Sequence, residues 1–246
     1  KVSEIFGQYF VRLPLKQSAT IVHGNSLRID WETVVPKSEL SFIIGNPPFY
    51  GKQLQSKQQK EDMKHIFNKV KGAGVLDYVA GWYLKAAQYI QHTNIPCAFV
   101  STNSIAQGEQ VGILWNEMFN KYNMNIHFAH RTFRWDNEAK GKAAVHVIIV
   151  GFQHKNTSNK KLYDYQDITG EPQLIRVKNI APYLVESGNI VIVKRRTPIS
   201  NVPNISFGSM PNDGGNLLLT DDEKDELLLN EPNAEKWIKP LLSARE

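Results

Sequence analysis

The chain has one cysteine, Cys97, among its 246 residues. A single thiol excludes an intrachain disulfide and any zinc site built from several cysteines. No stretch reaches the roughly 18 to 20 apolar residues of a membrane-spanning helix, and no secretory signal peptide is recognisable. We therefore expect a cytoplasmic protein with no membrane partner.

Several catalytic signatures are also missing. The sequence contains no His-Glu-x-x-His pair, no Ser-His-Asp arrangement and no phosphate-binding loop spacing,. Its acidic run, residues 221–226, follows Thr220 and includes Glu223, which is the spacing of a helix capping box,. This run therefore predicts the start of a helix, and we expect the chemistry to need no metal.

Composition is typical of a globular protein, with 41% apolar and 22% charged residues,. The formal net charge is +5 and the isoelectric point is about 9.1. An excess of positive charge favours an anionic partner such as double-stranded DNA, although an excess of this size is also common in proteins that bind no nucleic acid.

Apolar segments alternate with helical patterns, which predicts an α/β fold with a mostly parallel sheet. The expected strands are residues 19–23, 41–45, 97–102, 125–130 and 144–152, and the expected helices lie within residues 75–90 and 111–122. Residues 51–74, rich in Gln and Lys, indicate a mobile loop or an amphipathic excursion. The composition changes between about residues 155 and 185, where we expect a domain transition.

The sequence Asn46-Pro47-Pro48-Phe49 ends a short apolar run, residues 42–44. Two prolines fix φ and remove two main-chain donors, so they make a rigid rim at the carboxyl end of a strand. There the side chain of Asn46 and nearby carbonyl oxygens can accept hydrogen bonds from an exocyclic amino group. Phe49 can stack on the ring that carries this group. The alternative is an ordinary turn, since all of these residues are common in loops.

A second set of residues combines aromatic rings with positive charge. Phe133 and Trp135 alternate with Arg131 and Arg134 in an expected loop between two strands, and Lys140 and Lys142 follow. Aromatic and cationic side chains together can stack an extruded base and hold its phosphates. The alternative is that the two aromatic rings only seal the core.

Five motifs together make the chain resemble the N6-adenine DNA methyltransferases that use S-adenosylmethionine, and among them the MmeI-type single-chain restriction-modification enzymes. The motifs are residues 24–31, 45–49, 74–78, 131–135 with 143–147, and 207–215. They occur in the family's order and span nearly the whole chain.

The resemblance implies a Rossmann-like methyltransferase domain over residues 1–160, followed by the start of an α+β target-recognition domain over residues 161–246. It implies that Asn46, Pro47 and Pro48 hold the adenine amino group and that Phe49 stacks on the flipped ring. Phe133 would be the second stacking residue, with Trp135 as the alternative. Arg131, Arg134, Lys140 and Lys142 would contact DNA.

The resemblance further implies that Asn25, with Ser26 beside it, contacts the cofactor. Many relatives have an Asp at the position of Asn25. The family's glycine-rich cofactor loop does not precede Gly24. We therefore expect the first two strands to be missing, together with the N-terminal half of the same polypeptide, and the isolated chain to bind S-adenosylmethionine poorly.

Two other functions stay open from the sequence. The same Asn-Pro-Pro-aromatic arrangement serves methylation of other planar amines or amides, in RNA or protein. The chain could also be a DNA-specificity module without an activity of its own.

Overall fold

The computed structural model describes residues 19–135, 145–195, 197–198, 200–202 and 213–241. The chain divides into two compact units, Lys1–Lys194 and Arg195–Glu246.

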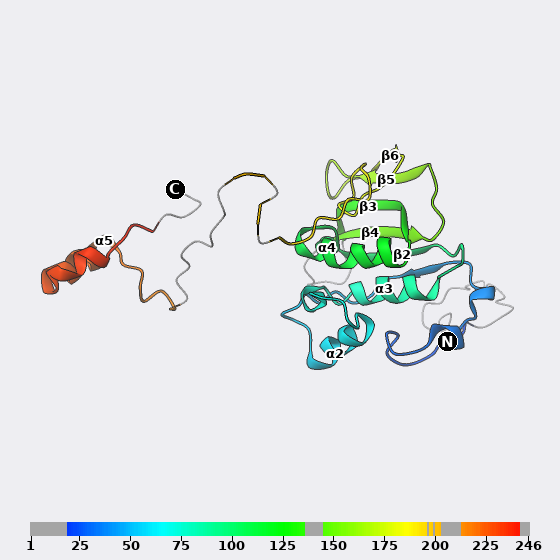
Figure 1. Cartoon of the computed structure of the whole chain (residues 1–246), viewed down its shortest axis with the longest axis horizontal. Coiled ribbons are helices and arrows are strands. Elements are labelled where there is room, and N and C mark those ends of the chain that lie inside the picture. Colours follow the sequence, from blue (N-terminus) through cyan, green and yellow to red (C-terminus); the bar gives the residue numbers. More distant parts are fainter. Residues whose placement is uncertain (1–18, 136–144, 196, 199, 203–212, 242–246) are drawn as a thin grey trace, which may run out of the picture. The chain divides into compact units, whose positions relative to one another are not determined.

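Six strands in the described part of the first unit form one mixed sheet (Figure 1). They are β1 (Ile43–Gly45), β2 (Cys97–Thr102), β3 (Asn125–Trp135), β4 (Val145–Gln153), β5 (Lys160–Asp164) and β6 (Gln173–Val177). Their order across the sheet is β1-β2-β4-β3-β5-β6. Strand pairs β1/β2 and β3/β5 are parallel, and the other neighbouring pairs are antiparallel.

The structure confirms the strands predicted at 97–102 and 125–130 and has strands within those predicted at 41–45 and 144–152, of which residue 144 lies outside the described residues, but the sheet is mixed and not mostly parallel. The reason lies in the connection between β3 and β4. Residues 136–144 are too few for the crossover between parallel strands, which takes about a dozen residues or more. Strand β4 therefore enters antiparallel between β2 and β3.

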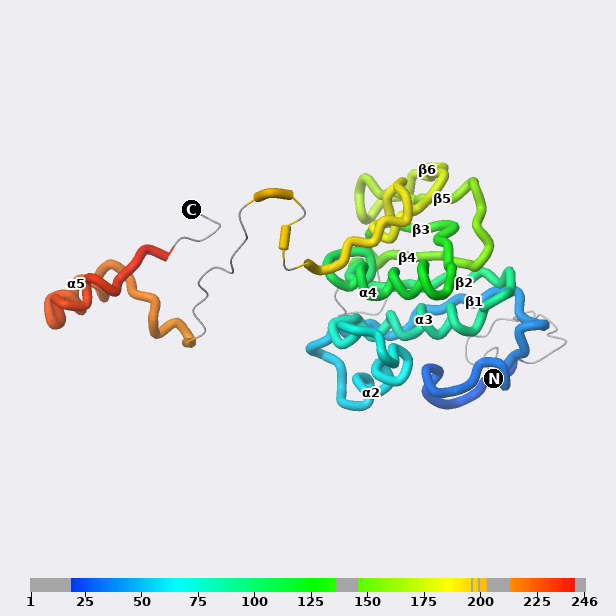
Figure 2. The backbone as a smooth tube through the Cα atoms, in the orientation of Figure 1, coloured from blue at the N-terminus to red at the C-terminus, as the bar shows by residue number. Residues whose placement is uncertain are grey.

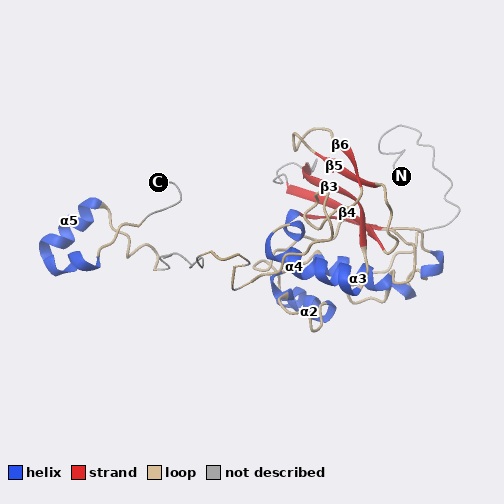
Figure 3. Ribbon diagram, turned by 45° about the horizontal axis from the view of Figure 1, so that its top comes forward, coloured by secondary structure: helices blue, strands red, loops and turns tan. Residues whose placement is uncertain are grey.

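Three helices of the first unit lie on the same side of the strands (Figure 3). They are α2 (Lys57–Ile66), α3 (Ala80–Tyr89) and α4 (Gly108–Asn116). Shorter helical segments lie before, between and after them, namely η1 (Trp31–Thr33), η2 (Lys37–Glu39), η3 (Ala73–Val75), η4 (Asn103–Ala106) and the π-helical η5 (Glu117–Lys121). Tyr83 of α3 is fully buried against the sheet, stacked on Phe152 and edge-on to Phe99. This aromatic contact joins the helical layer to β2 and β4.

Helix α2 lies where the sequence indicated a loop or an amphipathic excursion. Ser56 and Gln59 close a capping box at its N-terminus, which satisfies two main-chain donors,. The helix buries Asp62, Met63 and Ile66. A helix with so few apolar residues is stabilised mainly by this cap and by packing on α3, and for that reason hydrophobic periodicity missed it.

The strand predicted at residues 19–23 is wrong. This segment has no regular secondary structure and pairs with no described strand, and Ile21 is 88% exposed. Residues 24–40 instead run alongside α3 (Figure 2). Lys85 of α3 donates hydrogen bonds to the carbonyl oxygens of Leu27 and Ile29 at 3.0 and 2.6 Å, which ties the segment to the helix.

The described part of the second unit contains α5 (Asp221–Asn230) and the 3-10 helix η6 (Pro232–Trp237). The capping box predicted for Thr220 and Glu223 is confirmed, since each side chain bonds the other residue's main-chain N–H. No helix in the described parts of either unit is long and apolar enough to cross a membrane.

Candidate active site at the carboxyl edge of the sheet

The Asn46–Phe49 turn follows directly after β1, at the edge where the parallel strands β1 and β2 both end. Asn46 and Pro48 are exposed, Pro47 is buried and Phe49 is half-buried against the core. The buried Pro47 anchors the turn, and Asn46 directly before it is exposed. Ligands of open α/β sheets bind at this kind of edge.

A pocket of about 320 Å³ opens beside the turn. Asn46 and Pro47 form part of its wall, and Trp31, Trp82 and Phe99 supply aromatic rings. A Cβ atom at Gly45 would lie 3.3 Å from the ring of Phe99, so any side chain there would press on this wall of the pocket. The turn therefore borders a space that can receive a planar group.

The exit of the turn is held by hydrogen bonds from distant residues. The main-chain N–H of Tyr50 donates to Asp77 Oδ1 at 3.1 Å. The Tyr50 carbonyl accepts from the main-chain N–H of Tyr78 and from Gln55 Nε2, both at 2.9 Å. No role was expected from the sequence for Gln55 or Asp77, although Asp77 lies in one of the five motifs.

Asn25 and Ser26, the residues assigned to the cofactor, make hydrogen bonds within the protein. The Asn25 amide donates to Asp62 at 2.7 Å and accepts from the main-chain N–H of Leu27 at 3.0 Å. The Ser26 hydroxyl accepts from the indole N–H of Trp82 at 2.8 Å. Their side chains are therefore fixed in orientation.

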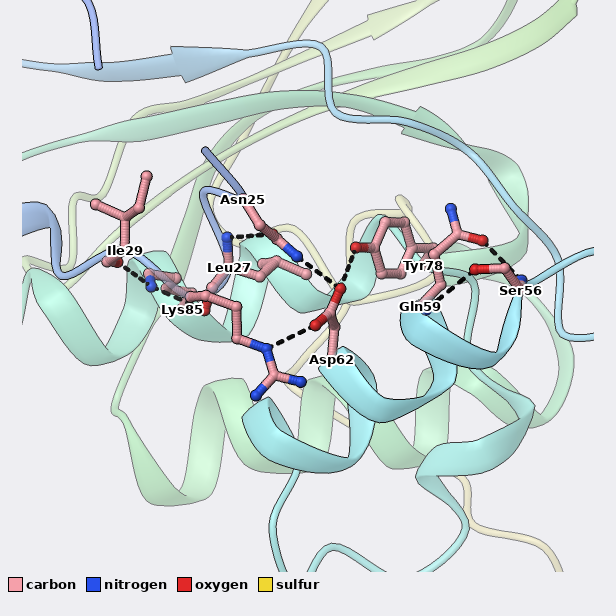
Figure 4. A network of polar contacts seen from close by, with 9 residues as sticks. Asn25, Leu27, Ile29, Ser56, Gln59, Asp62, Tyr78 and Lys85 are labelled. Atoms are coloured by element: carbon pink, nitrogen blue, oxygen red, sulfur yellow. Dashed lines mark hydrogen bonds and ion pairs between the residues drawn. The ribbon is translucent and has the colours of Figure 1, made fainter. Parts of the chain in front are cut away.

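Asp62 is the centre of this network, as Figure 4 shows. It is 2% exposed and accepts hydrogen bonds from Asn25, from Arg28 Nε at 2.6 Å and from the Tyr78 hydroxyl at 2.8 Å. Burial alone would raise the pKa of this carboxyl, but the three hydrogen bonds outweigh burial and hold the pKa below its ordinary value,. Asp62 thus joins α2 to the segment that carries Asn25. No sequence motif indicated it.

Phe133 and Trp135 lie in β3 itself and not in a loop, so that expectation is wrong. Phe133 is paired with Val147 of β4, and Val147 is paired with Thr102 at the end of β2. The two aromatic residues therefore lie at the same edge of the sheet as the Asn46–Phe49 turn. Strand β3 is three strands from β1, which corresponds to roughly 14 Å,.

The two arginines of this strand have different surroundings. Arg131 is partly buried, forms an ion pair with Asp164 at 3.0 Å and donates to the Leu184 carbonyl at 2.9 Å. Arg134 is exposed. Lys140 and Lys142 lie outside the described residues. In the described parts of the chain, no group of three or more His, Cys, Asp or Glu side chains could hold a metal ion.

Two family models match the chain. The model described as "MmeI, DNA-methyltransferase domain" matches residues 1–164, and "MmeI, target recognition domain" matches residues 186–246. DNA methyltransferase A of Bacillus subtilis (strain 168) is 43% identical over 236 residues, which cover 95% of this chain. The structure of the type IIL restriction-modification enzyme MmeI in complex with DNA is similar with a TM-score of 0.82 and 49% identity over 96% of this chain. The chain spans 26% and 32% of the lengths of these two relatives.

Proposed function

The chain belongs to the MmeI DNA-methyltransferase family, and we propose that it forms the target-base side of a site that methylates N6 of adenine in DNA. Its fold is the Rossmann-like methyltransferase fold, followed by part of a recognition domain. Within a restriction-modification enzyme, such a site would modify the enzyme's own recognition sequence.

The observation that carries the proposal is that Asn46 is exposed at the carboxyl end of β1 and lines an aromatic pocket. Asn46 Oδ1 and the Pro47 carbonyl oxygen would accept hydrogen bonds from the two N–H groups of the adenine amino group. Such bonding draws the nitrogen lone pair out of conjugation with the ring, so that it can attack a methyl group. Catalysis then comes from positioning and hydrogen bonding without a strong base.

A flipped adenine also needs aromatic surfaces on its faces. Phe49 adjoins Asn46 and would stack on one side of the ring. Phe133, or Trp135 in its place, would supply the second surface from β3. Both lie at the same sheet edge as the turn.

When bound, S-adenosylmethionine supplies the electrophilic methyl group. The residues present fit part of this cofactor, because the pocket beside Asn46 is lined by the rings of Trp31 and Trp82. Asn25 and Ser26 would contact the cofactor through their remaining hydrogen-bonding capacity. Since both relatives are much longer than this chain, we propose that the rest of the donor site comes from an N-terminal part of the same polypeptide.

DNA contacts would involve residues at the same edge and in the recognition region. Arg131, Arg134, Lys140 and Lys142 would neutralise phosphates. We place the catalytic part in residues 1–160 and the start of the recognition part in residues 161–246. The two family matches support a division in this region.

The test uses the full-length polypeptide that carries this chain, with DNA and S-adenosylmethionine labelled in its methyl group. Mass spectrometry of the digested DNA should detect 6-methyladenine. Asn46→Ala should lower turnover about 10²- to 10³-fold, the loss typical of one donor or acceptor aimed at a transition state, and leave DNA affinity unchanged. Asn120→Ala removes an exposed amide elsewhere and serves as the matched control. Methylated cytosine, RNA or protein as the product, or full activity of Asn46→Ala, would contradict the proposal.

A further inference from the structure

Asp77 lies at a junction of three elements, although it is on none of them. Asp77 is 3% exposed. Oδ1 accepts from the main-chain N–H of Tyr50 at 3.1 Å and from that of Val79 at 3.2 Å, and Oδ2 accepts from the Thr102 hydroxyl at 3.4 Å. One side chain thus contacts the exit of the Asn46–Phe49 turn, the approach to α3 and the end of β2.

Asp77 is itself held in place by the neighbouring helix. Its main-chain N–H donates to Gln110 Oε1 of α4 at 2.9 Å. Gln55, which is 7% exposed, bridges the carbonyl oxygens of Tyr50 and Leu76 at 2.9 Å each. The segment that carries Asp77 is therefore fixed to α4 on one side and to the residues after the turn on the other.

The prolines fix φ within the turn and Pro47 is buried, but the turn is poor in main-chain hydrogen-bond donors,. Pro47 and Pro48 have no main-chain N–H, so half of the turn cannot donate a hydrogen bond,. Tyr50 is the residue directly after the turn, and both its N–H and its carbonyl are bound to the segment 77–78 or to Gln55. Removing the acceptor for the Tyr50 N–H would leave a main-chain donor without its partner next to Phe49.

We propose that Asp77 is a positioning residue, which acts on the reaction through the Tyr50 amide by fixing the orientation of the Asn46–Phe49 turn. This inference rests on the proposed function and adds to it a residue that touches neither the base nor the cofactor. A displacement of about 1 Å in a reacting group can lower turnover by about 10²-fold, so a loosened turn would slow methyl transfer without abolishing DNA binding.

The experiment compares Asp77→Ala, Asp77→Ser and Asp77→Asn in the full-length polypeptide. Asp77→Ala removes every acceptor. Asp77→Ser keeps a local acceptor for Val79 but is too short to reach Tyr50, and it therefore provides a second variant if Asp77→Ala does not fold. Asp77→Asn retains Oδ1, and its amide nitrogen can donate to the Thr102 hydroxyl oxygen. Lys160→Met is the matched control, because it alters a buried polar side chain that bonds Asn179 and not the turn.

Two measurements separate the inference from the proposed function. In the first, hydrogen exchange of the Tyr50 amide is followed by NMR in the 246-residue chain. We expect exchange at least about ten times faster in Asp77→Ala and Asp77→Ser than in the unmodified chain, and near-unmodified exchange in Asp77→Asn and Lys160→Met. Unchanged exchange in both shortened variants would show that Asp77 does not hold the Tyr50 amide.

The second measurement is steady-state methylation. We expect kcat to fall about 10- to 100-fold in Asp77→Ala and Asp77→Ser, with KM for DNA within about twofold, and Asp77→Asn to recover most of the turnover. Unchanged kcat in the shortened variants, or an equal loss in Lys160→Met, would overturn the positioning role. If the unmodified enzyme methylates no adenine, the proposed function fails, while the exchange measurement still tests whether Asp77 holds the Tyr50 amide.

Discussion

The ring of Phe133 lies nearly parallel to that of Tyr165, with centroids 5.0 Å apart and planes inclined by 16°. The Tyr165 hydroxyl in turn lies 2.8 Å from His130 Nδ1, which fixes the tyrosine on β3. One face of Phe133 is therefore occupied by Tyr165. A flipped adenine would have to use the opposite face or the edge of the ring.

This arrangement predicts the effect of removing each ring. Phe133→Ala should lower kcat/KM about 5- to 150-fold, because stacking of a base on an aromatic side chain contributes about 1–3 kcal/mol. Tyr165→Leu should give a smaller loss, since Phe133 keeps its stacking surface and loses only its support. Tyr122→Leu is the control, because the hydroxyl of Tyr122 accepts a hydrogen bond from Gln88 of α3 and bonds neither Phe133 nor Tyr165. A larger loss in Trp135→Ala than in Phe133→Ala would assign the second stacking role to Trp135.

Asp62 should contribute strongly to stability. Asp62→Ala leaves the side-chain donors of Asn25, Arg28 and Tyr78 without their acceptor. We expect the free energy of unfolding to fall by about 2–3 kcal/mol, measured by urea denaturation. Glu61→Ala, one residue away on the exposed face of α2, should change it by no more than about 0.5 kcal/mol,. An equal loss of unfolding free energy in the two variants would show that the hydrogen bonds of Asp62 do not stabilise the fold.

The same carboxyl predicts a pH dependence. The pKa of Asp62 in the folded chain lies below its ordinary value of 3.8. The stabilisation is therefore complete above about pH 4 and is lost as the pH falls through the lower folded pKa. Asp62→Asn removes this titration, so the difference in unfolding free energy between the two proteins should narrow as the pH is lowered from about 5 to about 3. A difference that does not change with pH would contradict this prediction.

The sequence predicted local features of the fold well and distant contacts poorly. The strands in residues 97–102 and 125–130 and the cap at Thr220 depend on neighbouring residues, and all three are confirmed. Residues 19–23 have the pattern of a strand, but a strand also needs a partner, and none of the described strands pairs with them. Helix α2 could have been found from the Ser56 and Gln59 capping box, since that signal is local,.

The candidate site shows the same division. The Asn46–Phe49 turn could be recognised because two prolines and an aromatic residue are adjacent in sequence. Asp77 and Asp62 could not be assigned roles, because each acts on a residue far away in the chain, Tyr50 and Asn25 respectively. An isolated Asp in a sequence carries no sign of the main-chain N–H or amide that it will bind after folding.

Arg131 and Arg134 should respond differently to substitution. Arg131→Ala breaks the contacts to Asp164 and to the Leu184 carbonyl, so we expect a lower Tm. Arg134→Ala should reduce the slope of log K for DNA against log salt concentration by about 0.9, the effect of one phosphate contact. Calorimetry and DNA binding at several salt concentrations measure both. If Arg131→Ala reduced the salt dependence of DNA binding and left Tm unchanged, the main role of Arg131 would be to contact DNA and not to stabilise the fold.

Gly112 predicts a substitution whose effect opposes helix propensity. It lies in α4, where Ala is normally favoured over Gly by about 1 kcal/mol,. A Cβ atom there would lie 2.8 Å from the Ile192 carbonyl oxygen and 3.2 Å from Val193 Cα, both main-chain atoms. Because main-chain atoms cannot rotate away as a side chain can, residues 192–193 would have to move away from the surface of α4. Overpacking of this kind costs about 1–3 kcal/mol, so we expect Gly112→Ala to lower the unfolding free energy by about 1 kcal/mol net.

Gly74→Ala is the matched control, because no atom lies within 4 Å of the position that the new methyl group would take, and the φ of Gly74 is not positive. It should be neutral or slightly stabilising. Trypsin supplies a second readout, since Lys194 follows the displaced segment and its side chain is 83% exposed. Cleavage after Lys194 should be faster in Gly112→Ala than in Gly74→Ala. If Gly112→Ala were instead more stable than the unmodified chain, helix propensity would outweigh the contact, and residues 192–193 would not be packed on α4 in solution.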